Sequence, residues 1–155
     1  MSVMNDKTKA VTEKMRAICS RREYCTADIR ARLIKALDGD AKEVESVLES
    51  LVSDRYVDDF RYSSAYARDK SVISGWGKTK IRYMLSAKGI DRETISLALE
   101  EIDKDKSENR LLKLLDNKAK TLSDDPQCRM KLLRFALGRG YSYDEALSAI
   151  TQVLK

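Results

Sequence analysis

The sequence predicts an all-α protein in which one three-helix unit is repeated three times. Two observations predict this fold class. The 155 residues include one proline and six glycines, fewer than a turn-rich β fold needs. A pattern of glycine, capping residue and apolar stripe also recurs about every fifty residues, and a fixed period of this size is typical of a modular helical array.

The recurring pattern marks the end of the second helix and the start of the third in each unit. A glycine can adopt the left-handed conformation that closes a helix. The Asp or Ser that follows can then accept hydrogen bonds from the free N–H groups of the next helix. Asp40 with Glu43, and Ser142 with Glu145, have capping-box spacing. Any helical protein contains such signals singly, but here they recur in register, which favours a repeat. The three pairs are Gly39 with Asp40, Gly89 with Asp91, and Gly140 with Ser142.

Apolar residues at helical spacing predict the three helices of each unit in order. The first helices carry Val11, Met15, Ile18 and Cys19, then Phe60 to Ala67, then Leu111, Leu112, Leu115 and Ala119. The second helices carry Ile29, Leu33 and Leu37, then Ile81, Met84 and Leu85, then Leu132, Leu133, Ala136 and Leu137. The third helices carry Val44, Val47, Leu48 and Leu51, then Ile95, Ala98, Leu99 and Ile102, then Ala146, Ala149, Ile150 and Val153. We therefore expect units at residues 8–56, 57–104 and 105–155.

The composition indicates a cytoplasmic protein. No run approaches the roughly 18 apolar residues that span a bilayer, and residues 1–10 are polar, without an apolar signal-peptide core. The three cysteines, Cys19, Cys25 and Cys128, are an odd number. Reduced thiols in a cytoplasm explain them more simply than a disulfide framework does.

The residue inventory excludes most enzyme classes and predicts no cofactor and no metal. There is no histidine, the commonest general base and metal ligand, and two nearby cysteines alone are too few ligands for zinc. Gly77-Lys78-Thr79 resembles the end of a P-loop, but Val72 stands where that motif needs glycine, and the preceding residues favour a helix over a strand. Asp58-Asp59 is expected to cap a helix rather than to perform acid–base chemistry.

Charge alternates along the chain in step with the repeat. Stacked units would present their basic helices as a row, which favours a phosphate backbone or an acidic protein groove. Solvated helix faces with weak ion pairs are the alternative, and charge alone leaves both open. The basic residues (Lys and Arg) and the acidic residues (Asp and Glu) number nine and three in residues 7–35, two and eight in 38–60, seven and one in 61–88, three and seven in 90–108, and eight and three in 109–139.

Aromatic residues gather near the boundary between the first two units. We expect them to pack between units, with base stacking on nucleic acid as the alternative. Gly75 and Gly77 are expected to break the chain between two helices. Trp76 between them could pack under that loop, which we favour, or serve as an exposed anchor for a partner. The aromatic group consists of Tyr56, Phe60, Tyr62 and Tyr66.

Four short motifs occur in order along the chain: Arg22–Arg30, Leu51–Tyr62, Lys78–Ile90 and Arg139–Ser142. Together they resemble those of the RecX family of recombination regulators, and the resemblance extends from about Ala17 to Val153. Cys25 stands where the family commonly has serine. The resemblance implies three tandem three-helix modules in an elongated, curved array. It further implies that the protein lies in the deep helical groove of a RecA filament and modulates, mainly by inhibition, the activity of RecA; any ATP would belong to RecA.

The expected partner is the RecA filament, with sequence-independent contact to single- or double-stranded DNA as an additional candidate. A helix-turn-helix transcriptional regulator is the alternative function. Lys78–Lys88 would then be the recognition helix, although Ile81 and Leu85 suggest that half of it is buried. The candidate partner contacts, chosen by charge and repeat position together with the tryptophan, are Arg30, Arg32, Lys35, Trp76, Lys78, Lys80, Arg82, Lys88, Arg129, Lys131, Arg134 and Arg139.

Overall fold

The structure, a computed structural model, describes residues 5–155; residues 1–4 of the polar N-terminal stretch lie outside that range. Within the described range the chain forms nine helices and no strand, so the all-α fold class is confirmed. The helices are α1 Asp6–Arg21, α2 Thr26–Ala36, α3 Ala41–Ser53, α4 Asp59–Val72, α5 Lys78–Ala87, α6 Arg92–Glu100, α7 Lys104–Lys120, α8 Cys128–Gly138 and α9 Tyr143–Val153.

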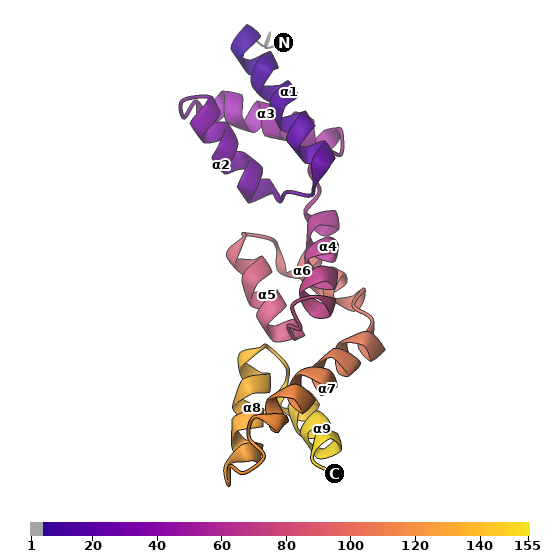
Figure 1. Cartoon of the computed structure of the whole chain (residues 1–155). Helices are drawn as coiled ribbons and strands as arrows, with labels where there is room; N and C mark the ends of the chain where they lie inside the picture. The colour runs from indigo at the N-terminus through magenta and orange to yellow at the C-terminus, as the bar shows by residue number, and fades with distance from the viewer. Residues whose placement is uncertain (1–4) are drawn as a thin grey trace.

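The helices group into three modules that stack into an elongated molecule (Figure 1), with the N-terminal helix at one end and the C-terminus at the other. Module 1 comprises α1 to α3, module 2 comprises α4 to α6, and module 3 comprises α7 to α9. Each module surrounds its own cluster of buried apolar side chains. The second helices, α2, α5 and α8, lie along the same side of the stack (Figure 1). The repeated stripe therefore builds three small cores rather than one large one.

The third helices begin as the sequence predicts. Asp40, Asp91 and Ser142 each accept a hydrogen bond from a backbone N–H in the first turn, and the preceding glycines have φ of +77°, +76° and +95°. The full capping box forms at Ser142 and Glu145. In a full capping box the Glu43 carboxylate would accept from the backbone N–H of Asp40. Here it accepts instead from the Thr8 hydroxyl of α1 at 2.8 Å.

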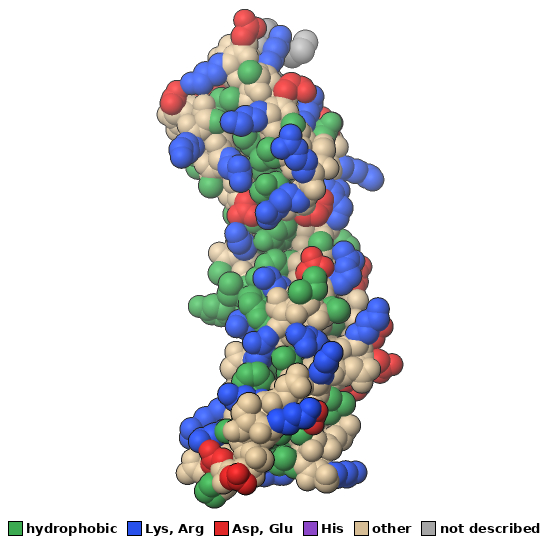
Figure 2. Space-filling view, viewed as in Figure 1, with side chains coloured by type: hydrophobic (Ala, Val, Ile, Leu, Met, Phe, Trp, Pro, Cys, Tyr) green, Lys and Arg blue, Asp and Glu red, His purple; other side chains and the backbone are tan. Residues whose placement is uncertain are grey.

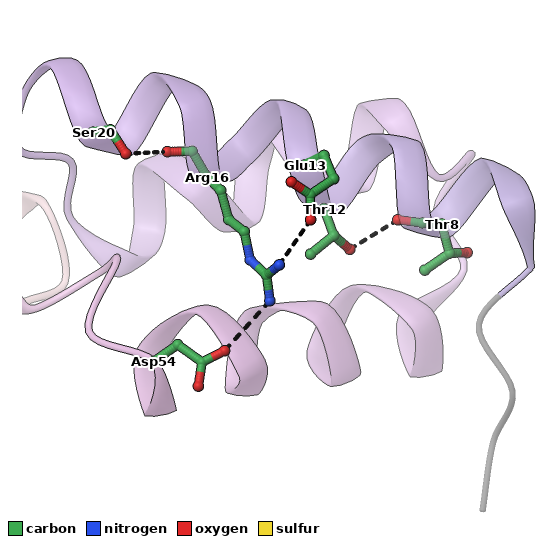
Figure 3. Close-up of polar contacts among 6 residues, drawn as sticks. All are labelled: Thr8, Thr12, Glu13, Arg16, Ser20 and Asp54. Atoms are coloured by element: carbon green, nitrogen blue, oxygen red, sulfur yellow. Dashed lines mark hydrogen bonds and ion pairs between the residues drawn. The ribbon is translucent and has the colours of Figure 1, made fainter.

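Polar contacts hold α1 against α3 beside the apolar packing of Met15 and Cys19 (Figure 3). Arg16 donates to Glu13 at 2.7 Å on its own helix and to Asp54 at 3.4 Å, just beyond the end of α3. Its guanidinium also lies over the Tyr56 ring, 5.5 Å from the centroid. Arg16 thus ties the start of the chain to the segment that leads into module 2.

The junction between modules 1 and 2 is formed by the segment that leads into α2. Cys25 is fully buried and packs within the core of module 2, although it precedes the second helix of module 1. Burial raises the pKa of its thiol to about 11. Asp59 accepts from the N–H of Thr26 at 2.7 Å, so a residue of α4 caps α2. Asp58 caps α4 itself, which confirms the capping interpretation.

The junction between modules 2 and 3 is a backbone-to-backbone contact. The Gly77 N–H donates to the carbonyl of Arg139 at 2.8 Å, and the Thr79 N–H donates to the carbonyl of Gly140 at 3.0 Å. Gly77 has an ordinary φ of −83°, but a Cβ there would lie well inside 3.0 Å of the Gly140 carbonyl. Glycine is therefore required at Gly77 by the approach of module 3 and not by the backbone conformation.

The helix before Gly77 bears on the P-loop alternative. The segment before Gly77-Lys78-Thr79 is the helix α4 and not the strand that a P-loop follows. Among residues 5–155 no helix combines the length and apolar character needed to cross a bilayer. The same residues hold no group of three or more His, Cys, Asp or Glu side chains suited to a metal ion.

Candidate partner-binding surface

The twelve candidate contacts do not form one uniform row. Some face solvent, and others lie in the junctions between modules, where they bind the chain itself. The exposed candidates are Arg32, Lys35, Lys78, Arg82, Lys88, Arg129, Lys131 and Arg134, and the half-buried ones are Arg30, Trp76, Lys80 and Arg139.

Arg139 lies in the junction between modules 2 and 3. Its guanidinium donates to the carbonyls of Ser74 and Gly75. The Tyr141 hydroxyl donates to the same Gly75 carbonyl at 3.1 Å, and burial raises the pKa of that tyrosine to about 12. The Arg-Gly-Tyr segment therefore clamps the loop that precedes α5, and Arg139 has a structural role.

Lys88 lies in the junction between modules 1 and 2. Its ammonium forms an ion pair with Asp28 of α2 at 2.9 Å. Burial opposes ionisation of Asp28, but hydrogen bonds from Lys88 and Cys25 outweigh it and lower the pKa of the carboxyl. The hydrogen bond with Asp28 raises the pKa of Lys88. Lys88 thus helps to fix the two modules relative to one another.

Trp76 packs against the core of module 2. Its ring makes an edge contact with Tyr66, with centroids 6.4 Å apart. The ammonium groups of Lys70 and Lys80 lie 4.7 and 4.4 Å from the ring centroid, a cation–π geometry. Packing under the loop is thereby confirmed, and Lys80 is engaged with it.

The aromatic group near the first boundary is divided. Tyr62 and Tyr66 stack, with centroids 5.9 Å apart, in module 2, whereas Tyr56 packs against the core of module 1. The three tyrosines thus pack against the cores of their own modules rather than between modules, which differs from the expectation, and the side chain of Phe60 is 40% exposed. It follows the capping residue of α4, where the helix turns it away from both cores.

Six of the exposed basic candidates have no ion pair within the described part of the chain. Of these, Arg32 lies over the Tyr24 ring and Arg82 donates to Ser96, which leaves four side chains without such a contact. Blue basic side chains are visible over all three modules in Figure 2, with red acidic ones fewer on that face. Exposed guanidinium and ammonium groups without a partner are the ones available to a polyanion or an acidic protein. These four are Lys35, Lys78, Arg129 and Arg134.

Two exposed apolar features were not predicted from the sequence. Tyr83 on α5 is 73% exposed. An apolar groove lies between α8 and α9, with Met130 and Tyr143 at its exposed edge. Comparing equivalent positions of the repeat could have found the groove, because Leu133 and Leu147 stand where the other modules have polar residues.

These features define a class of protein: an all-helical protein built from three tandem three-helix modules, each around its own apolar core. Models of the second and third three-helix domains of RecX match residues 58–99 and 106–150. Regulatory protein RecX of Clostridium botulinum (strain Alaska E43 / Type E3) is 32% identical, over 92% of this chain and 72% of its own length. The chain belongs to the RecX family.

Further relatives agree with that assignment. Regulatory protein RecX of Mycobacterium sp. (strain KMS) is 32% identical over 90% of this chain and 81% of its own length. The relative in Clostridium tetani is 29% identical, and this chain covers 54% of its length. The crystal structure of RecX from Lactobacillus salivarius superposes with a TM-score of 0.86 at 20% identity, covering 97% of this chain and 98% of that one. The tandem three-helix architecture is therefore shared with a solved RecX fold.

Proposed function

We propose that this protein regulates RecA in the cytoplasm by binding along the RecA–DNA filament, with mainly inhibitory effect and without a reaction or cofactor of its own. The observation that carries the proposal is the combination of RecX membership with an elongated array whose second helices share one side. A filament offers the same binding surface at regular intervals. An array of three repeated modules is suited to bridging successive subunits.

The junctions support this mode of binding. Each module is held to the next by hydrogen bonds and buried side chains rather than by a free linker. A preorganised array loses little conformational freedom on binding, so its weak individual contacts can act together.

The junctions also disfavour the helix-turn-helix alternative. A recognition helix reads bases with residues near its N-terminus. In α5 that terminus is covered by module 3, through the contacts of Gly77 and Thr79. In α2 the first N–H group is bound by Asp59 of α4. Ile81 and Leu85 of α5 are fully buried.

ATP hydrolysis by RecA on single-stranded DNA tests the proposal. Purified protein added at amounts well below that of RecA should slow hydrolysis, because one array would affect several subunits. Unchanged hydrolysis together with tight, sequence-specific duplex binding would support the transcriptional regulator instead.

A further inference from the structure

In modules 1 and 2, polar side chains bridge the second and third helices at equivalent positions of the repeat. In module 1, Arg30 of α2 pairs with Glu45 of α3 at 2.8 Å. At the equivalent positions of module 2, Arg82 donates to the hydroxyl of Ser96 at 3.3 Å. Each bridge joins the two helices and satisfies its own polar groups within the module.

Module 3 has leucines at both equivalent positions. Leu133 of α8 and Leu147 of α9 stand 51 residues after Arg82 and Ser96. Ile150, which corresponds to Leu48 and Leu99, also lines the groove. The polar bridge of the other modules is thus replaced by an apolar surface, with a hollow of about 590 Å³.

The edges of this groove add exposed apolar and basic groups. Met130 and Tyr143 are 51% and 57% exposed. Arg129 and Arg134 also line the groove, and neither has an ion pair in residues 5–155. No acidic residue lines it. An apolar patch bordered by arginines is typical of a protein-interaction site.

We infer that the α8–α9 groove is an anchor site for RecA, which inserts an apolar side chain flanked by carboxylates. The inference rests on the proposed function and deepens it. The leucines, Met130 and Tyr143 would surround the apolar side chain, and Arg129 and Arg134 would bind the carboxylates, for which guanidinium geometry is suited. A phosphate backbone would leave the leucine-lined floor unfilled, so the chemistry favours a protein segment over DNA.

The test restores the polar bridge that the other modules already have. Leu133→Arg combined with Leu147→Glu should close the groove with the pair that module 1 already holds at these positions. Circular dichroism checks that the core of module 3, against which Leu133 packs, is retained. Binding to RecA filaments on single-stranded DNA, measured by co-sedimentation, should weaken about tenfold. The matched control is Val72→Arg with Leu97→Glu, which introduces the same two charged residues at exposed apolar positions of α4 and α6 and should bind within about twofold of the original chain.

The outcomes separate this inference from the function on which it rests. If the unmodified protein does not sediment with the filament, the proposed function and the inference both fail. If it does and the bridged variant binds equally well, only the anchor site fails. An equal loss of binding to bare single-stranded DNA, or conversion of a self-associated protein to a monomer in sedimentation velocity, would also overturn the inference. Should the bridged variant unfold, Met130→Ser with Tyr143→Ser alters only exposed side chains and should still weaken binding at least about threefold.

Discussion

Gly77 illustrates how a single hydrogen atom in place of a side chain permits two modules to meet. We expect Gly77→Ala to lower the free energy of unfolding by about 2 kcal/mol, because the added methyl would collide with the Gly140 backbone. Gly138→Ala is the matched control: a Cβ there meets nothing within 4 Å, and alanine favours the helix by about 0.5 kcal/mol. Urea denaturation measures both, and equal stabilities of the two variants would refute this role.

At this scale the sequence predicts local roles better than distant ones. The caps Asp40, Asp91 and Ser142 were predictable because each acts on residues within one turn. Arg139 was predicted to face a partner because it is basic and lies at the end of a second helix. Its actual acceptors are backbone carbonyls more than sixty residues earlier in the chain, and the local sequence does not indicate them. The capping of α2 by Asp59 of α4 was not predictable either, because Asp59 is far from α2 in the sequence.

Between elements, the Asp28–Lys88 pair links stability to pH. The pKa of Asp28 is lowered in the folded protein. Its contribution to the free energy of unfolding is therefore present above the ordinary carboxyl pKa range and is lost as the pH falls through the pKa of the folded state. The pKa of Lys88 is raised in the folded protein. Its contribution to the free energy of unfolding is therefore present below the ordinary lysine pKa range and is lost as the pH rises through the pKa of the folded state.

We therefore expect Lys88→Met to lower the free energy of unfolding by at most about 1 kcal/mol near pH 7, since the pair is partly exposed. The difference from the unmodified chain should shrink as the pH falls below the ordinary carboxyl range, because protonation of Asp28 removes the charge with which Lys88 pairs. Chemical denaturation across pH measures it. Lys113→Met, at an exposed lysine of α7 that has no ion pair in residues 5–155, serves as control. A pH-independent effect at Lys88 would contradict the role of the ion pair.

We also propose that the second helices carry the charge used in binding RecA. Lys78→Glu with Arg82→Glu on α5 should weaken binding to the RecA filament about fivefold at 0.1 M salt and less at higher salt, since exposed charges are screened. Lys104→Glu with Lys106→Glu, on the first helix of module 3, reverses the same charge elsewhere. Fluorescence anisotropy of labelled protein can compare the pairs, and equal losses would show that only net charge matters.

For the whole molecule, the hydrogen bonds and buried side chains that join the modules predict cooperative unfolding. Since Cys25 completes the core of module 2 and the α5 loop is bonded to module 3, the three modules should unfold in one transition when followed by circular dichroism and by Trp76 fluorescence. Two separated transitions would indicate that the modules are independent.

The overall architecture was predictable because the same pattern of helix-ending glycine, capping residue and apolar stripe occurs three times in the sequence. How the modules face one another was not, since the junctions depend on contacts such as Cys25 in a neighbouring core and Gly77 against Gly140. The division of the basic residues into junction and surface groups follows from that packing. So does the groove at Leu133 and Leu147, which becomes visible only when equivalent positions are compared.

We propose that one elongated array contacts successive RecA subunits through the side that bears α2, α5 and α8. Helical reconstruction by electron microscopy of RecA filaments on single-stranded DNA, decorated with this protein, can test this arrangement. We expect continuous density for three modules along the filament groove, with that side against RecA. Density from one module alone, or protein bound only to filament-free DNA, would refute the proposed arrangement.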